Sequence, residues 1–222
     1  MISGEWGYST SAKPEPGGPY ANVSTQAKYL PRMFLHNMAM GVNLTVWYDW
    51  HDDGTDPGNV ENNFGIVGPA YSGNVSLPYT PKPAYAAAVA VASHTRACPD
   101  YQRTDEIVVS SGQSCFANGT CFNHTVCYAQ YWACATNNDA SELIAVWCGA
   151  NDGWSTALDV PVASTAEHDR RERRCWMQSN WLGEVQTIPR CVTFCTTQNA
   201  QGCGRARLSV VASNAPTYLR PA

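Results

Sequence analysis

The segment Ile2–Tyr8 carries the residue best suited to covalent chemistry. It places a carboxylate, Glu5, at the end of a short apolar stretch, and Gly7 allows a tight turn soon after it. A carboxylate at the end of a strand can attack the anomeric carbon of a sugar and form a glycosyl–enzyme ester. Taken alone, the same motif also fits a solvated glutamate near a frayed chain end.

Aromatic residues gather in a second segment, residues 45–54. The indole rings of Trp47 and Trp50 could stack on sugar rings, or they could pack in a core. Strand alternation puts Trp47 and Asp49 on one face and Tyr48 and Trp50 on the other. We therefore expect one tryptophan to line a cleft and the other to pack, and the alternation does not tell them apart.

Three polar residues follow the aromatic ones and could bind sugar hydroxyls: His51, Asp52 and Asp53. The same loop has some likeness to a calcium loop. Aligning Gly54 with the obligatory glycine of such a loop puts His51 and Val60 at ligand positions, and neither supplies a carboxylate. We therefore predict no metal and no other cofactor.

Composition excludes several classes of protein. The chain has 222 residues, of which only 14% are charged, and its net charge is −4, whereas a nucleic-acid-binding protein normally has a basic face. No apolar run reaches the length of about 18 residues that a membrane span needs. An apolar fraction of 44%, with eight Trp and eleven Tyr, excludes a disordered chain. We therefore expect neither a nucleic-acid partner nor a membrane.

The ten cysteines all lie at Cys98 or later, and residues 1–97 contain none. An even number at this density predicts up to five disulfides formed in an oxidising compartment. A zinc site is disfavoured because no C-x-x-C pair is present. The spacing leaves the pairing open. The cysteines are at positions 98, 115, 121, 127, 134, 148, 175, 191, 195 and 203.

Five N-glycosylation sequons point to the same compartment, so we expect a secreted protein. We interpret the one at Asn43 as a chance match, because Asn43 lies in a strand expected to be buried. The first residues have neither a basic nor an apolar signal region, so we expect the true N-terminus to be missing. The sequons begin at Asn22, Asn43, Asn74, Asn118 and Asn123.

The first half of the chain has a strand–helix–strand–helix pattern. Ser24 is the expected N-cap of the first helix, and Pro31 should kink it or mark a late start. Pro83 suits the first turn of the second helix. The continuous apolar run of the second strand is typical of a buried parallel strand. The expected elements are a strand at 1–8, a helix at 24–40, a strand at 42–49, a polar loop at 50–80 and a helix at 84–93.

The second half has short strands separated by turns, which favours an antiparallel β-sandwich. The charged cluster at 167–174 is expected to be a solvated loop or a short helix. The expected strands are 106–110, 126–133, 143–148, 157–162, 185–188, 191–195 and 207–212.

Two strands and two helices cannot form a domain, because both strand edges and much apolar surface would stay open. We therefore predict that residues 1–95 are the last quarter of a larger α/β fold. Residues 96–222 would then form a separate, cysteine-rich domain.

Six blocks in the chain, in order, resemble the clan A glycoside hydrolases, in particular the cellulase-like family 5 and family 39 groups. These are retaining enzymes with a (β/α)8 barrel. The likeness is good over residues 1–95 and loose beyond them, where the cysteines are not part of the family pattern. The blocks are Ile2–Ser9, Gln26–Leu30, Thr45–Gly54, Phe64–Val67, Lys82–Tyr85 and Ala215–Arg220.

The resemblance implies that Glu5 is the nucleophile on the seventh barrel strand. It also implies a monomer whose partner is a carbohydrate substrate. The substrate contacts would come from Trp6, Tyr8, Trp47, Trp50, His51 and Asp52. In this clan the acid/base is a Glu preceded by Asn on the fourth strand. No Asn–Glu dipeptide occurs in the 222 residues, so we expect a C-terminal fragment that is inactive alone.

Two alternatives remain open at this point. The chain could be a non-catalytic, cysteine-rich carbohydrate-binding or adhesion module that carries the remnant of a barrel. It could also be a complete chain with an unrelated fold and a structural role.

Overall fold

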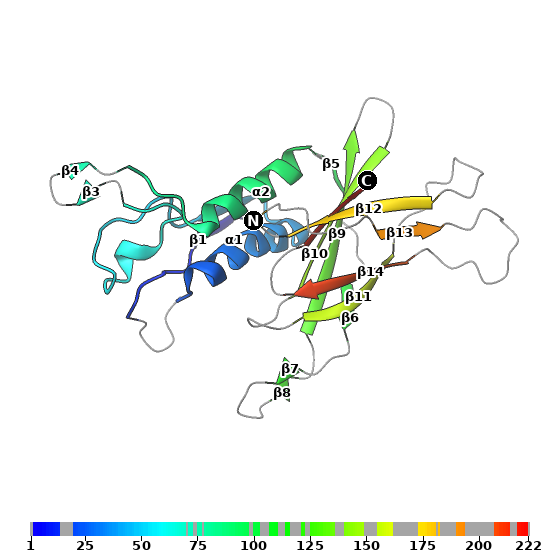
Figure 1. The fold of residues 1–222 in the computed structure, drawn as a ribbon, viewed down its shortest axis with the longest axis horizontal. Coiled ribbons are helices and arrows are strands. Elements are labelled where there is room, and N and C mark those ends of the chain that lie inside the picture. The colour runs from blue at the N-terminus through cyan, green and yellow to red at the C-terminus, as the bar shows by residue number, and fades with distance from the viewer. Residues whose placement is uncertain are drawn as a thin grey trace, which may run out of the picture. The chain divides into compact units, whose positions relative to one another are not determined.

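The chain divides into two compact units (Figure 1): Met1–His94 with Trp181–Gly183, and Thr95–Asn180 with Glu184–Ala222. The computed structural model describes residues 2–13, 20–69, 71–72, 75–76, 78–97, 100–102, 107–110, 114–115, 121–122, 125–135, 140–148, 155–161, 173–180, 182, 190–193, 207–213 and 217–221. Side chains are described for residues 2–13, 20–38, 40–69, 78–96, 144–147, 180, 182 and 218.

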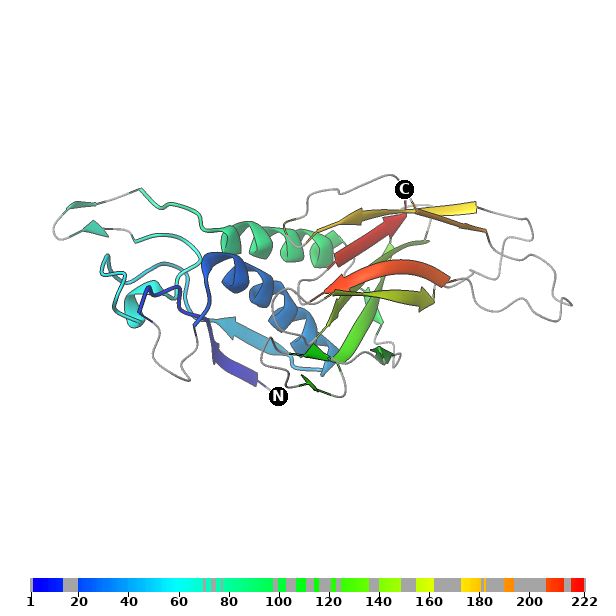
Figure 2. The ribbon, with the colours of Figure 1, turned by 60° about the horizontal axis from the view of Figure 1, so that its bottom comes forward.

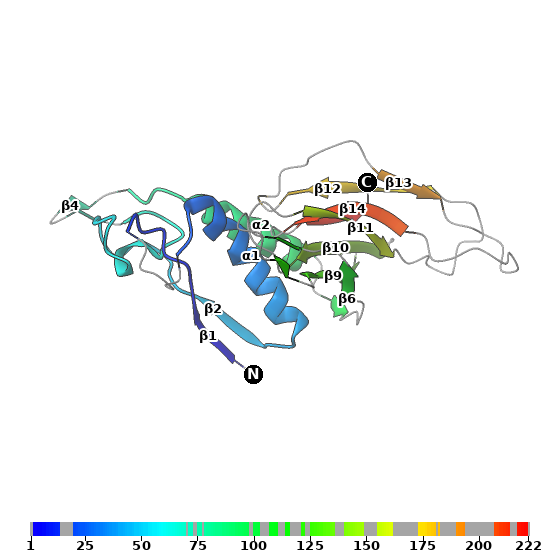
Figure 3. The ribbon, with the colours of Figure 1, turned by 90° about the horizontal axis from the view of Figure 1, so that it is seen from below.

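Two parallel strands form the sheet of the first unit (Figure 3). Strand β1 spans Ile2–Trp6 and strand β2 spans Leu44–Trp47, both shorter than expected. An irregularity in the register between Ser3 and Glu5 shifts the pairing, so that Glu5 lies opposite Val46. The parallel pairing is the one that the strand–helix–strand–helix pattern predicts. The barrel to which we assigned these strands stays a prediction.

Helix α1 connects the two strands and spans Val23–Ala39. Asn22 is its N-cap, because the Asn22 Oδ1 atom accepts a hydrogen bond from the Thr25 N–H at 2.8 Å. The prediction of Ser24 as the N-cap was wrong, since Asn22 has an equally suitable side chain two residues earlier. Pro31 lies inside the helix. It removes one backbone hydrogen bond but neither delays the start of the helix nor ends it.

Helix α1 contacts the sheet through a polar residue, Asn37, and has buried apolar residues along its length. Ala27, Leu30 and Leu35 are buried, and the Asn37 Nδ2 atom donates to the hydroxyls of Ser3 and Thr45, each at 3.1 Å. These two bonds identify the face of β1 and β2 that turns toward the helix.

The opposite face of the sheet is uncovered in the described part of the chain. Leu44 and Val46 alternate with Thr45 and are 51% and 44% exposed, and Ile2 is 70% exposed. The prediction of a buried second strand was therefore wrong here, because only one face of β2 has a helix packed on it. Asn43, the sequon residue that we expected to be buried, is also exposed.

The segment between β2 and the second helix is more structured than the polar loop we predicted. It contains a short 3-10 helix, η1, at Glu61–Asn63, and a hairpin of β3 (Tyr71–Ser72) and β4 (Val75–Ser76). Helix α2 spans Pro83–Ala97 and begins with the proline expected in its first turn. Neither helix in the described part of the chain has the length and apolar character that a membrane span requires.

The second unit consists of strands (Figure 2), and every pair in its described residues is antiparallel. Its main sheet has the order β13-β12-β15-β10-β9-β5, with β6 also paired to β9. Strands β11 and β14 form one further pair, and β7 and β8 another. The bounds are β5 Asp100–Gln102, β6 Ile107–Ser110, β7 Ser114–Cys115, β8 Cys121–Phe122, β9 Thr125–Ala135, β10 Ala140–Cys148, β11 Ser155–Pro161, β12 Arg173–Ser179, β13 Arg190–Thr193, β14 Arg207–Ser213 and β15 Thr217–Pro221.

The buried side chains described in this unit lie where β10 meets β15. Residues Ile144–Trp147 are buried, and so is Tyr218, which pairs with Ala145. Burial raises the pKa of Tyr218 far above its ordinary value. A sandwich of two packed sheets stays a prediction.

Most of the strands expected in this unit are present, with a few corrections. The charged cluster at 167–174 was expected to lack strands, but β12 begins at Arg173, because Arg173 pairs with Thr193 of β13. Strands β5, β7 and β8 were not predicted, since two or three residues are too few for an alternating pattern. The strand expected at 185–188 lies outside the described residues.

Candidate active site

The carboxyl ends of β1 and β2 lie at the same edge of the sheet because the strands are parallel. Trp6 pairs with Trp47, and the next backbone bond runs from the Tyr48 N–H to the Trp6 carbonyl at 2.6 Å. The Glu5 side chain is exposed, and it forms no hydrogen bond or ion pair with the described part of the chain. A carboxylate in this position can meet a ligand directly.

Gly7 is needed for a close approach between the two strand ends. A Cβ atom at Gly7 would lie 1.8 Å from the Tyr48 carbonyl oxygen and 3.1 Å from the Phe64 ring. Its backbone angles are ordinary, since among the described glycines only Gly41, just after α1, has a positive φ, of 70°. The absence of a side chain, rather than an unusual turn, therefore lets the chain pass β2 immediately after Glu5.

The two tryptophans at the end of β2 and in the loop after it have different environments. Trp47 is half-buried and lies 6.3 Å from the ring of Tyr8. Trp50 is 51% exposed, and its ring contacts Tyr85 at 6.0 Å and Tyr79 at 6.5 Å. Trp50 is therefore the indole that a ligand can reach, while Trp47 packs within the unit.

The two aromatic residues that follow Glu5 differ in the same way. Trp6 is 47% exposed and is open to a ligand. Tyr8 packs edge-on against Tyr29 of α1, with the ring centroids 4.9 Å apart. The geometry favours a packing role for Tyr8.

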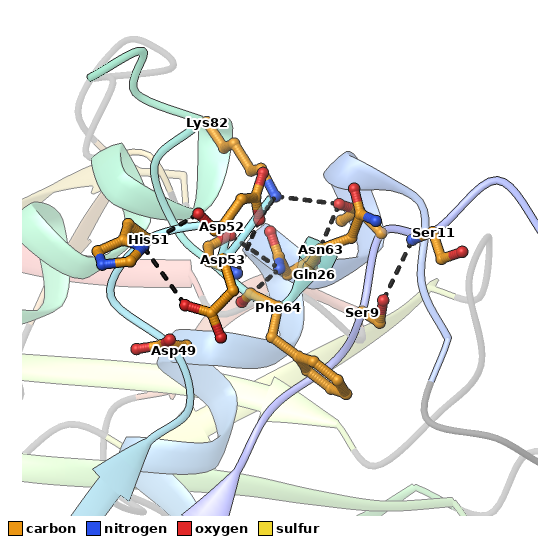
Figure 4. Close-up of polar contacts among 12 residues, drawn as sticks. Ser9, Ser11, Gln26, Asp49, His51, Asp52, Asp53, Asn63, Phe64 and Lys82 are labelled. Carbon is orange, nitrogen blue, oxygen red and sulfur yellow. Dashed lines mark hydrogen bonds and ion pairs between the residues drawn. The ribbon is translucent and has the colours of Figure 1, made fainter. Parts of the chain in front are cut away.

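Asp52 is buried and holds three segments together (Figure 4). The Lys82 Nζ atom donates to Asp52 Oδ1 at 2.6 Å and to Thr10 Oγ1 at 3.1 Å. The Gly65 N–H donates to the same carboxylate oxygen at 2.9 Å. These bonds tie the loop after β1 and the loop after β2 to the residue that precedes α2. The geometry therefore favours a structural role for Asp52 over the sugar contact that the resemblance implies.

Burial dominates the electrostatics of this ion pair. Loss of hydration raises the pKa of Asp52, although the hydrogen bond and the charge of Lys82 act in the opposite direction. Loss of hydration likewise lowers the pKa of Lys82 against the effect of Asp52. The attraction within the pair thus offsets only part of the desolvation cost, so each charge depends on its partner.

Gln26 is a second buried polar residue near this edge, and it is also drawn in Figure 4. Its Nε2 atom lies 2.8 Å from the Tyr8 carbonyl, 3.2 Å from that of Phe64 and 3.3 Å from that of Gly65. A side-chain amide from α1 thus fixes backbone on both loops. Gln26 and Lys82 lie in two of the blocks that resemble glycoside hydrolases, but no role was predicted for either of them. Their hydrogen-bond partners are distant in the sequence, so no local spacing of residues indicates the contacts.

A further group near the strand ends could hold a metal ion: Asp49, His51 and Asp53, whose ligand atoms lie within 4.8 Å of one another. Contacts within the loop account for this grouping. Asp49 accepts a hydrogen bond from the Trp50 N–H, and the His51 Nδ1 atom lies 3.0 Å from the Asp52 carbonyl and 3.7 Å from Asp53 Oδ1. Three ligands are also fewer than Ca²⁺ requires. His51 is half-buried, with its ring 6.1 Å from that of Tyr79.

Comparisons with known proteins bear on the fold. No protein-family model and no curated protein sequence matches this chain. The structure is similar to that of a family 39 glycoside hydrolase from the gut symbiont Bacteroides cellulosilyticus WH2, with a TM-score of 0.56 and 19% identity. The likeness covers 100% of this chain and 33% of that chain, so this chain spans about a third of the other's length. It has a fold like part of a glycoside hydrolase.

Proposed function

We propose that this chain is the C-terminal part of a secreted retaining β-glycosidase in which Glu5 is the nucleophile. The observation that carries the proposal is the parallel pairing of β1 with β2. It brings the exposed Glu5 carboxylate to the same edge of the sheet as the loop that carries the exposed Trp50. A carboxylate beside an accessible indole is a usual combination in sites that cleave sugars.

The uncovered face of the sheet supports a larger catalytic unit. Parallel sheets are normally covered on both faces, whereas Ile2, Leu44 and Val46 are exposed on β1 and β2. In a (β/α)8 barrel such residues would point into the barrel core and be covered by the other strands. The likeness to one third of a family 39 glycoside hydrolase agrees with this proposal.

The proposed reaction has two steps. The Glu5 carboxylate attacks the anomeric carbon and forms an ester, while a second carboxyl protonates the departing glycosidic oxygen. That second group then acts as a base, and water cleaves the ester to release the sugar and restore Glu5. The resemblance assigns the second carboxyl to a strand preceding Glu5 in the chain.

Covalent labelling tests the role of Glu5. A 2-deoxy-2-fluoro β-glycoside with a dinitrophenyl leaving group should label a chain extended upstream to contain the acid/base. The fluorine slows both steps, and the good leaving group restores only the formation of the ester. Peptide mapping by mass spectrometry should find the sugar on Glu5. A label on any other carboxylate would overturn the assignment.

Exchanging each tryptophan for alanine should separate ligand contact from packing. In the same extended chain, Trp50→Ala should raise KM about tenfold, which corresponds to the loss of about 1.4 kcal/mol of stacking, with little change in stability. Trp47→Ala should lower the melting temperature, because Trp47 packs beside Tyr8. The reverse pattern in the two variants would contradict this assignment.

A further inference from the structure

We propose that three cross-strand disulfides, Cys115–Cys121, Cys127–Cys148 and Cys175–Cys191, staple successive hairpins of the second unit. Each bond would join two cysteines that the strand register places directly opposite one another. The first pair belongs to β7 and β8, the second to β9 and β10, and the third to β12 and β13.

The backbone spacing at these positions suits a disulfide. All three strand pairs are antiparallel, and directly opposed residues of such strands have Cα atoms about 4.5–5.5 Å apart. A disulfide typically joins Cα atoms about 4.4–6.8 Å apart. The typical spacing of opposed residues therefore lies within the range that a disulfide spans.

The pairing is also far from what chance would produce. Seven cysteines lie in described strands, and six of them have another cysteine as their register partner. Ten cysteines in 222 residues would make a random partner a cysteine only about one time in twenty. The exception, Cys134, lies opposite Ser141 in the same ladder as Cys127 and Cys148.

Each bond forms by an oxidation with a defined balance. Two thiols lose two protons and two electrons, and a disulfide oxidant such as oxidised glutathione accepts them and becomes two thiols. This exchange proceeds in the oxidising compartments where secreted proteins fold. The proposal assigns no partner to the remaining four cysteines, at positions 98, 134, 195 and 203.

Disulfide mapping of the full chain, produced through the secretory pathway of a eukaryotic cell, tests the proposal. Free thiols are alkylated first, the chain is digested without reduction, and linked peptides are identified by mass spectrometry. We expect three linked species, one for each proposed pair, and each should separate into its two parts after reduction. Where both cysteines fall in one peptide, reduction should instead raise the mass of that peptide by the mass of two hydrogen atoms.

A matched pair of variants in one ladder gives an independent test. Cys127→Ala should leave the Cys148 thiol free, so that a maleimide labels it in the unreduced protein. Cys134→Ala, seven residues along the same strand, should leave Cys148 unlabelled. Mapping of the unmodified chain remains decisive if a variant fails to fold.

Three outcomes would overturn the proposal. One is a peptide that links any of the six cysteines to a different partner. Another is alkylation of all six in the unreduced secreted protein. The third is a stoichiometric zinc ion whose removal with a chelator frees these thiols.

Discussion

Glu5→Gln should abolish glycoside hydrolysis in a chain that contains the acid/base, with kcat falling about 10⁴-fold or more. An amide oxygen is a poor nucleophile and cannot form the ester through which both steps proceed. Initial rates on aryl β-glycosides measure the loss. Since Glu5 is exposed and has no partner in the described part of the chain, the same substitution in the 222-residue chain should leave its melting temperature unchanged.

Two comparisons make this result specific. Glu61→Gln makes the same chemical change at an exposed carboxylate of η1 and should leave kcat within about twofold. Glu5→Ala should regain turnover when azide is added, because the small anion can attack the anomeric carbon in place of the missing carboxylate. Retention of most activity by Glu5→Gln would exclude Glu5 as the nucleophile.

The 222-residue chain alone should hydrolyse no aryl glycoside. The general acid that we propose to lie upstream is worth about 10²–10⁴ in rate, and two strands cannot hold a sugar in position for attack. Glu5-dependent turnover by this chain would place the acid within these residues and contradict the fragment interpretation. Sugar binding without turnover by the extended chain would favour the non-catalytic carbohydrate-binding alternative.

Lys82→Met should destabilise the first unit by about 3–5 kcal/mol. The substitution leaves the Asp52 carboxylate buried, with a side chain only 8% exposed, and removes the donor that reaches both Asp52 and Thr10. Urea unfolding of the full chain gives the free energy of unfolding. Amide hydrogen exchange in peptides from residues 48–82 reports on this unit separately.

Two further variants test whether the loss comes from the unpaired charge. Lys13→Met removes an exposed lysine and should change stability by no more than about 0.5 kcal/mol. Adding Asp52→Asn to Lys82→Met should recover part of the loss, because no charge is then buried without a partner. A double variant as unstable as the sum of its single variants would show that the two side chains act independently.

The order of elements in the first unit could be predicted from the sequence because its signals are local. Apolar runs, helical spacing and Pro83 at a helix start identify two strand–helix pairs, and a helical connection favours parallel pairing. Exact boundaries were less certain. Asn22 and Ser24 are both good N-cap residues. Only the hydrogen bond that the Thr25 N–H donates to Asn22 Oδ1 distinguishes them.

The roles of individual side chains were decided by tertiary structure. Alternation separates Trp47 from Trp50, but only the position of Tyr8 beside Trp47 determines which of them packs. Asp52 looked like one polar group among several in a loop. It is buried against a lysine 30 residues away. Contacts between loops do not recur at a regular spacing, so no local pattern in the sequence predicts this one.

For the cysteines too, one part of the result could be predicted from the sequence and another part depends on the tertiary structure. Their number and their confinement to residues 98–222 predict disulfides, whereas spacing alone permits hundreds of pairings. Register selects among them, since it depends on how many residues each turn inserts and on which faces the strands bury. That information is distributed over whole hairpins, so the sequence by itself determined that the cysteines should pair, and only the folded sheets decided which of them lie opposite one another.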